Sequence, residues 1–287
     1  MADLGPTHAG GRPPGVTGPH RARTVGLTIA GVDSGGGAGI VADLRTFDAL
    51  GVWGTVALTA ITAQNSVGIQ RVEILAPDVV RAQIDSVLAD LRPDAIKTGM
   101  LGNSAVVATV AEALGAASAP LVVDPVLIAT SGRRLLDEGG VEAVRDRLLP
   151  LATLVTPNLA EAAALTGVRP GGRAEMAAAA QALVRLGSGA ALVTGGHLPG
   201  DLVADCLVVG DAAPCWFEAP RLPGGSTHGT GCVLSAAVTA RLACGSPVEQ
   251  ACERGISFVR AAIAGRVVLG GGDGAADPAA ARPLRED

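Results

Sequence analysis

The sequence has few aromatic side chains, 2% of its 287 residues, and it contains no tyrosine. Proteins that bind single-stranded nucleic acid stack the bases on aromatic rings, so this scarcity argues against such a partner. The formal net charge of −5 and the isoelectric point near 5.4 also argue against a surface that binds phosphate backbones. We therefore expect a small molecule or another protein subunit as the partner, and no nucleic acid.

Long apolar runs are also missing, although 48% of the residues are hydrophobic and the mean hydropathy is +0.41. No uninterrupted run reaches the ~18 residues of a membrane-spanning helix. The first 23 residues, MADLGPTHAGGRPPGVTGPHRAR, are rich in glycine and proline and lack the apolar stretch of a secretory signal. The hydrophobic content therefore predicts a buried core and no membrane association.

The cysteines form no CxxC pair, and their number is odd, which argues against a metal knuckle and a disulfide framework. We expect free thiols in a reducing cytoplasm. All but Cys232 lie in apolar patterns and are expected to be small core residues. The five are Cys206, Cys215, Cys232, Cys244 and Cys252.

Apolar runs alternate with amphipathic segments over residues 24–269, which we expect to form one domain. TVGLTIAG predicts a strand and GIVADLRTFDALG a helix, and this alternation continues along the chain. Unbroken apolar strands between helices indicate an α/β fold, with a mostly parallel sheet covered on both faces. VADCLVVG and APCWFEAP predict a hairpin. Residues 1–23 and 270–287 lack periodicity and are predicted to be disordered.

Ligands of parallel sheets bind beyond the carboxyl ends of the strands, which selects the loops that follow each predicted strand. The first, GVDSGGGAGI, matches neither the dinucleotide nor the P-loop pattern, but its glycines permit close approach of the backbone to a ligand. The alternative is a loop tightened for packing. In the second, ITAQN, the amide of Gln64 offers a donor and an acceptor that suit the edge of an aminopyrimidine. Gln64 and Asn65 are also typical of residues that satisfy loop backbone.

Two later loops carry carboxylates. Asp124 ends PLVVDP, and Asn158 and Glu161 open a predicted helix at TPNLAE. Asn158 as N-cap and Glu161 three residues later fit a variant of the capping box. If Asp124 and Glu161 converge at the sheet edge, they also indicate Mg²⁺ binding and phosphate positioning.

THGTGC is the most specific of these loops. Its glycines leave backbone N–H groups free at the start of a helix, where the helix dipole favours anions. Cys232 lies in the first turn, so the same field predicts a lowered thiol pKa. His228 is expected to hydrogen-bond within the loop rather than to act as a catalyst.

Seven motifs together resemble one family. In order, they are AGVDSGGGAGIVADLRTF, LTAITAQNSVG, IKTGML, VVDPV, TPNLAEA, GGHL and STHGTGC. Their order and spacing are similar to those of bacterial hydroxymethylpyrimidine/phosphomethylpyrimidine kinases of thiamine biosynthesis, in the ribokinase-like superfamily. The resemblance covers about residues 24–266. It implies a three-layer αβα sandwich, ATP as the phosphoryl donor, Mg²⁺ as its cation and a homodimer.

The resemblance also implies a role for individual residues. Gln64 binds the ring nitrogen and amino group of the pyrimidine, and Asp43 lies near the hydroxymethyl end. Cys232 is the base that takes the hydroxyl proton, and Asn158 and Glu161 match an N-x-x-E element of the Mg²⁺–phosphate region. The ring pocket is implied to contain Ala38, Thr62, Met100 and Val126. The anion hole is implied to consist of Gly229, Thr230 and Gly231.

The chain departs from the family pattern at three positions: Val32 replaces Ser or Thr, Val41 replaces Gln, and Thr194 replaces Lys. A missing cation near the nucleotide phosphates predicts weaker ATP binding, unless Lys97 or an arginine replaces it. Two other functions therefore stay open. One is a pyridoxal or pyridoxine kinase, which shares GTGC. The other is a protein that binds a pyrimidine or nucleotide without catalysis.

Overall fold

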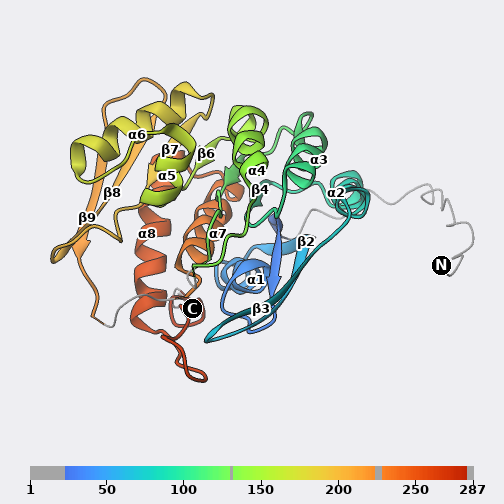
Figure 1. The fold of residues 1–287 in the computed structure, drawn as a ribbon, viewed down its shortest axis with the longest axis horizontal. Coiled ribbons are helices and arrows are strands. Elements are labelled where there is room, and N and C mark those ends of the chain that lie inside the picture. Colours follow the sequence, from blue (N-terminus) through green and yellow to red (C-terminus); the bar gives the residue numbers. More distant parts are fainter. Residues whose placement is uncertain (1–22, 130–131, 224–227, 283–287) are drawn as a thin grey trace, which may run out of the picture.

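A computed structural model of the chain describes residues 23–129, 132–223 and 228–282 (Figure 1). Nine strands in these residues form one sheet, in the order β3-β2-β1-β4-β5-β6-β7-β8-β9. Neighbours from β2 through β7 pair in parallel, whereas β3, β8 and β9 are antiparallel to their neighbours. The strands are β1 Val25–Asp33, β2 Trp53–Asn65, β3 Gly68–Ile74, β4 Ala95–Thr98, β5 Leu121–Val123, β6 Leu154–Val155, β7 Ala190–Val193, β8 Leu202–Val209 and β9 Cys215–Pro220.

Helices cover both faces of this sheet. One face packs against α1 Gly39–Ala49, α7 Thr230–Ala243 and α8 Val248–Ala264. The other packs against α2 Pro77–Asp90, α3 Ser104–Leu114, α4 Glu138–Ala143, α5 Leu159–Thr166 and α6 Arg173–Arg185. These layers confirm the predicted three-layer αβα sandwich.

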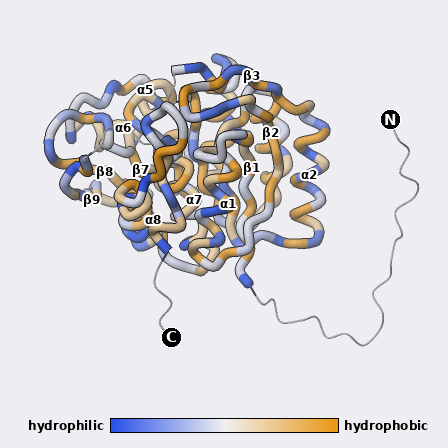
Figure 2. The backbone as a smooth tube through the Cα atoms, turned by 90° about the horizontal axis from the view of Figure 1, so that it is seen from below, coloured by the Kyte–Doolittle hydropathy of each residue, from blue (hydrophilic) through white to orange (hydrophobic). Residues whose placement is uncertain are grey.

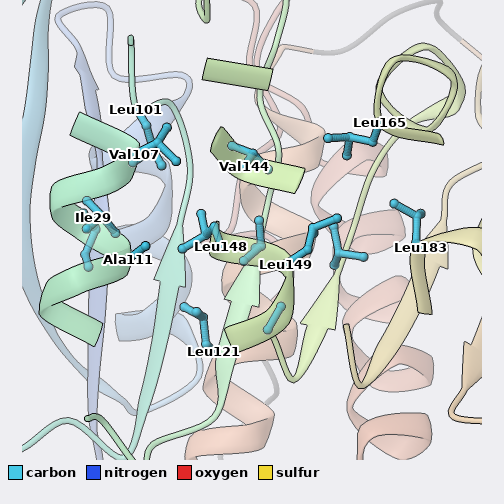
Figure 3. Close-up of a cluster of buried hydrophobic side chains, with 14 of the residues drawn as sticks. Ile29, Leu101, Val107, Ala111, Leu121, Val144, Leu148, Leu149, Leu165 and Leu183 are labelled. Carbon is cyan, nitrogen blue, oxygen red and sulfur yellow. The ribbon is translucent and has the colours of Figure 1, made fainter. Parts of the chain in front are cut away.

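The central strands are apolar throughout because each of their faces is buried. In β5, Leu121 and Val123 point into the core beneath α3 and α6, and Val122 points into the core beneath α7 and α8. Figure 3 shows the first of these cores, where Leu148 and Leu149 lie beside Leu121. Each fully buried side chain of this size contributes roughly 1.5–3 kcal/mol to folding. Figure 2 shows the same concentration of hydrophobic residues among the central strands.

The structure differs from the prediction at the β2–β3 hairpin. Strand β2 extends through Gln64 and Asn65, which were expected beyond its end, and β3 had not been predicted. β3 has no fully buried residue and mixes polar with apolar side chains, so it lacks the unbroken hydrophobic run of the central strands. The hairpin carries Gln64 outward on a paired strand.

A second difference concerns the C-terminal segment. The prediction of disorder from Gly270 onward is wrong for residues 270–282. Ala275 pairs with Val267 and with His228, and Ala276 is buried. The glycines allow this segment to cross closely, since a Cβ at Gly272 would overlap the Ser66 carbonyl oxygen. Residues 1–22 and 283–287 of the predicted disordered ends lie outside the described part. Within the described part, no helix has the length and hydrophobicity to span a membrane.

Candidate active site

The two glycine-rich loops meet at the carboxyl edge of the sheet. Gly229, at the N-cap of α7, has φ +79, and a Cβ there would overlap the carbonyl oxygen of Gly37. Only glycine combines this left-handed backbone with so close an approach. GGGAG and HGTGC are therefore in direct contact. Gly229 is the first of the three residues predicted to form an anion hole, and Thr230 and Gly231 follow it in the first turn of α7.

Asp33 organises the first loop from the end of β1. It accepts hydrogen bonds from the backbone N–H groups of Gly35 (2.7 Å), Gly37 (3.1 Å) and Ala38 (3.0 Å). His228 Nε2 lies 3.0 Å from Asp33 Oδ2. Burial raises the pKa of Asp33, but the His228 hydrogen bond and those of the backbone outweigh it, so the net pKa is lowered. Sequence reasoning missed this residue, although an aspartate two residues before a glycine run is a turn signal.

Gln64 lies at the end of β2, in reach of the same histidine. Its backbone is held by Ser34, whose hydroxyl accepts from Gln64 N (2.8 Å) and donates to Gln64 O (2.7 Å). Its carboxamide lies 3.2 Å from Thr62 Oγ1 and 3.1 Å from His228 Nε2. Asn65 instead accepts from Val67 N within the hairpin turn, as expected for a residue that satisfies loop backbone.

The four residues predicted to line a ring pocket lie at neighbouring strand ends. Ala38 follows the first loop and Thr62 donates to Val32 O, so both lie near the end of β1. The Met100 sulfur packs over Gly31, and Thr59 Oγ1 donates to the Met100 carbonyl. Val126 lines a small cavity with Thr98 and Asp124.

Lys97 and Asp43 form an ion pair with no exposed surface. Lys97 Nζ lies 2.9 Å from Asp43 Oδ1 and 3.9 Å from Asp124 Oδ2. Thr28 Oγ1 donates to Asp43 at 2.6 Å. Burial raises the pKa of Asp43, and the nearby carboxylates raise that of Lys97 despite burial. Asp43 thus lies beneath the site rather than at its surface. The Lys97 ammonium is buried with it, and its role as a replacement for the missing nucleotide cation stays a prediction.

Cys232 is half-buried in the first turn of α7. Burial raises the pKa of its thiol to about 12. Lys97 and the backbone N–H of Gly39 oppose this, while Asp43 and Asp124 add to it. The predicted lowering of the thiol pKa is therefore wrong: desolvation outweighs the helix start and the lysine.

Asn158 and Glu161 form the capping box. Asn158 Oδ1 accepts from Glu161 N (3.0 Å), and Glu161 Oε2 accepts from Asn158 N (2.9 Å). Burial, and then the charge of Asp124, raises the pKa of Glu161 to about 8. The predicted capping box is thus confirmed, and Leu127 N donates to Glu161 Oε1 (3.4 Å), so the Glu161 carboxylate lies at the loop that follows Asp124.

The surroundings of Asp124 suit a hard cation. Ser235 Oγ donates to Asp124 Oδ2 at 2.8 Å. The hydroxyls of Thr98 and Thr156, at the ends of the flanking strands, are buried and have no hydrogen-bond partner among the residues that the structure describes. No group of three His, Cys, Asp or Glu residues in the described ranges could hold a metal alone. Mg²⁺ commonly binds one or two carboxylates and completes its shell with water and substrate phosphates.

The loop after β7 is fixed from both sides. Thr194 pairs with Asn158, and Gly195 N donates to Asp205 Oδ1 at 2.8 Å. Burial raises the pKa of Asp205 to about 6. Arg221 donates to the carbonyls of Gly196, Leu198 and Gly200, so it holds residues 195–200 together.

Comparison with known proteins assigns a family to this arrangement. The family model for phosphomethylpyrimidine kinase matches residues 33–277. The hydroxymethylpyrimidine/phosphomethylpyrimidine kinase of Streptomyces coelicolor is 49% identical over 251 residues, 88% of this chain and 93% of that protein. The Rhizobium meliloti protein of the same name is 47% identical, over 87% of this chain and 95% of its own.

Solved structures share the fold. An ADP complex of Bacillus subtilis pyridoxal kinase superposes with a TM-score of 0.85 at 35% identity, covering 92% of this chain and 100% of that one. A phosphomethylpyrimidine kinase from Clostridium difficile gives a TM-score of 0.75 at 37% identity, covering 84% of this chain and 100% of that one.

Proposed function

The chain belongs to the phosphomethylpyrimidine kinase family, and from this we propose that it phosphorylates 4-amino-5-hydroxymethyl-2-methylpyrimidine with ATP, in thiamine biosynthesis. The monophosphate is then phosphorylated again to the pyrophosphate. The observation that carries the proposal is the contact between Gly37 and Gly229, which brings the anion loop beside the Gln64 amide. The Gln64 amide, for the pyrimidine ring, and the loop at Gly229, for the phosphoryl group, thus lie at one edge of the sheet.

Each transfer forms one oxygen–phosphorus bond and breaks another. In the first transfer the hydroxymethyl oxygen attacks the γ-phosphorus of ATP, and in the second a phosphate oxygen of the monophosphate attacks it. In both, the bond from the γ-phosphorus to the β,γ-bridging oxygen breaks, and ADP leaves with that electron pair. Backbone N–H groups at Gly229–Gly231 stabilise the charge on the transferring group. Positioning and charge stabilisation dominate such reactions, because the transition state is loose.

The hydroxyl proton is assigned to Cys232. Only the thiolate can accept that proton, and a pKa of about 12 makes the thiol the major form near neutral pH in the free protein. Cys232 must therefore first release its own proton to water, and as the thiolate it takes the hydroxyl proton late, after most of the new bond has formed. Beneath it, the Lys97–Asp43 pair fixes the charges that face the sulfur.

Mg²⁺ and ATP would bind at the adjoining part of the edge. Asp124 and Glu161 would hold the cation, which would offset the repulsion between these carboxylates and neutralise phosphate charge. Asn158 and Thr194 pair with each other, and they would border the nucleotide phosphates. The five free cysteines suit a reducing cytoplasm, and a homodimer is part of the same proposal.

A second candidate function is phosphorylation of pyridoxal. The observation that favours it is the similarity to solved pyridoxal kinases, among them one from Staphylococcus aureus in complex with pyridoxal, with a TM-score of 0.84 at 35% identity. Both substrates carry a hydroxymethyl group on a six-membered nitrogen ring, so one phosphoryl-transfer corner serves either.

ADP release from purified protein tests both. With Mg·ATP and the hydroxymethylpyrimidine, we expect one equivalent of ADP and then a second, as the monophosphate is consumed. Robust turnover of pyridoxal without turnover of the pyrimidine would reject the first function. Binding of either ring without ADP release would identify a non-catalytic protein, as weak ATP binding at Thr194 would predict.

A further inference from the structure

His228 contacts two groups that make opposite hydrogen-bonding demands on the same ring nitrogen. Its Nε2 lies 3.0 Å from Asp33 Oδ2 and 3.1 Å from Gln64 Nε2. An ionised carboxylate only accepts hydrogen bonds, and an amide nitrogen only donates them. One ring nitrogen therefore cannot satisfy both neighbours with the amide oriented in this way.

The charge of Asp33 indicates that the orientation of the Gln64 amide, rather than the state of the carboxylate, must differ. The Asp33 carboxylate already accepts three backbone N–H groups and has a lowered pKa, so it is ionised near neutral pH. His228 Nε2 must then carry the proton and donate it to Asp33. The oxygen and nitrogen of a carboxamide have nearly the same shape, so their assignment follows from the hydrogen-bond network.

Exchanging the two atoms of the Gln64 amide removes the conflict. Its oxygen then shares the His228 Nε2–H with Asp33 in a three-centre hydrogen bond, and its nitrogen faces Thr62 Oγ1. The Thr62 hydroxyl donates to Val32 O at 3.0 Å, so its lone pairs are free to accept from the amide. We propose that the Asp33–His228 pair fixes the Gln64 carboxamide in this orientation, which makes His228 a positioning residue for pyrimidine recognition.

The orientation decides which ring edge the site binds. One amide N–H and one oxygen lone pair remain available, side by side, for a ligand. A 4-aminopyrimidine offers the matching pair, a ring nitrogen beside an amino group. In pyridoxal a methyl-bearing carbon separates the ring nitrogen from the hydroxyl, so no such adjacent edge exists. The inference rests on the proposed function and gives its site a preference for the aminopyrimidine.

The pair itself is held rigidly by backbone. Asp33 is fixed by the N–H groups of its own loop. His228 is fixed by the C-terminal segment, since its N donates to Gly274 O (3.0 Å) and its O accepts from Ala276 N (3.1 Å). The imidazole is only partly exposed, at 26%, beside the nearly buried Asp33. Rigid support of this kind is what a positioning residue needs.

Steady-state kinetics of His228→Ala and His228→Gln test the inference. His228→Ala is expected to raise the KM for the hydroxymethylpyrimidine at least tenfold, with kcat and the KM for ATP changed less than threefold. Glutamine places an N–H donor near the position of Nε2, so His228→Gln should recover most of the affinity. A role in folding alone would lower the melting temperature without this split between KM values.

Two further variants separate this inference from the proposed function. Gln64→Ala measures the full loss of the amide, and an unchanged pyrimidine KM in that variant would overturn the pocket and the inference together. A raised KM in Gln64→Ala with an unchanged KM in both His228 variants would overturn only the positioning role. In Gln64→Ala/His228→Ala the two effects should not add, since both act through one amide. Gln70→Ala, an exposed amide of the same hairpin, is the matched control.

Discussion

At Cys232 opposing effects act on a single sulfur. The start of α7, the Gly39 N–H and Lys97 favour the thiolate, whereas burial and the carboxylates of Asp43 and Asp124 favour the thiol. Lys97 also contacts the carboxylates of Asp43 and Asp124, and their negative charges offset much of the effect of its ammonium on the thiol pKa. The balance leaves a protonated thiol.

Alkylation by iodoacetamide measures this balance. With a pKa of about 12, only about one thiol in 10⁴ is ionised at pH 8. Cys232 is therefore expected to react far more slowly than the exposed Cys244, with its rate still rising tenfold per pH unit up to pH 10. Mass spectrometry of digested peptides follows both sites, and Cys244→Ala confirms the assignment. Rapid labelling of Cys232 at pH 7 would show that the sulfur is a thiolate, which would contradict a pKa raised by burial.

Among the elements, the start of α7 and the loop before α1 depend on each other. Gly229 combines a left-handed backbone with a contact to Gly37 that leaves no room for a side chain. Gly231 carries no side chain either, and a Cβ there would lie 4.0 Å from Asp124 Oδ2. The phosphoryl corner is therefore a junction of two elements, not a property of one loop.

Gly229→Ala should break this junction. The left-handed backbone alone costs about 1 kcal/mol for alanine, and the overlap with the Gly37 carbonyl must also push the loops apart. We expect kcat/KM to fall more than a hundredfold. Gly167→Ala is the matched control: Gly167 ends α5 with φ +76, but a Cβ there meets nothing within 4 Å. That variant should lose about 1 kcal/mol of stability and keep its activity, as thermal unfolding and ADP release would show. Equal activity in both variants would contradict the junction.

How well the sequence predicts these elements depends on how each is buried. Strands covered on both faces, such as β1 and β5, are unbroken apolar runs and were predicted within a few residues. The partly exposed β3 lacks that signal and was missed. The segment VEAVRDRLLPL (141–151) has the hydrophobic spacing of a single helix, but it forms the end of α4, a π-helical turn at Val144–Leu148 and a 3-10 turn at Leu149–Leu151. Hydrophobic spacing does not distinguish these three kinds of helix.

In the molecule as a whole, the site gathers residues from the start of the chain to its end. Motif order predicted that the loops would meet, because carboxyl ends of parallel strands share one edge. It did not predict that Lys97, on β4, pairs with Asp43, on α1, below that edge, since this pairing depends on the distance between elements far apart in the sequence. Asp33 and His228 were missed as a pair for the same reason: they are separated by 195 positions.

The C-terminal segment belongs to this whole-molecule arrangement. Residues 270–282 return from α8 across the β2–β3 hairpin and pair with His228. Two backbone hydrogen bonds join His228 to the segment, and each contributes roughly 0.5–1.5 kcal/mol. A segment rich in glycine and alanine thus supports the residue that we infer to orient Gln64.

Ending the chain at Leu269 should therefore impair pyrimidine binding more than ATP binding. Without Gly274 and Ala276, the His228 backbone loses both partners, and the imidazole no longer holds the Gln64 amide. We expect the pyrimidine KM to rise about tenfold or more, with a smaller change in the ATP KM, and the melting temperature to fall by several degrees. A chain that ends at Arg282 is the matched control and should behave as the full chain does. Only the chain that ends at Leu269 loses the two backbone hydrogen bonds of His228. If both truncated chains have the same KM for the pyrimidine, the segment does not support the site.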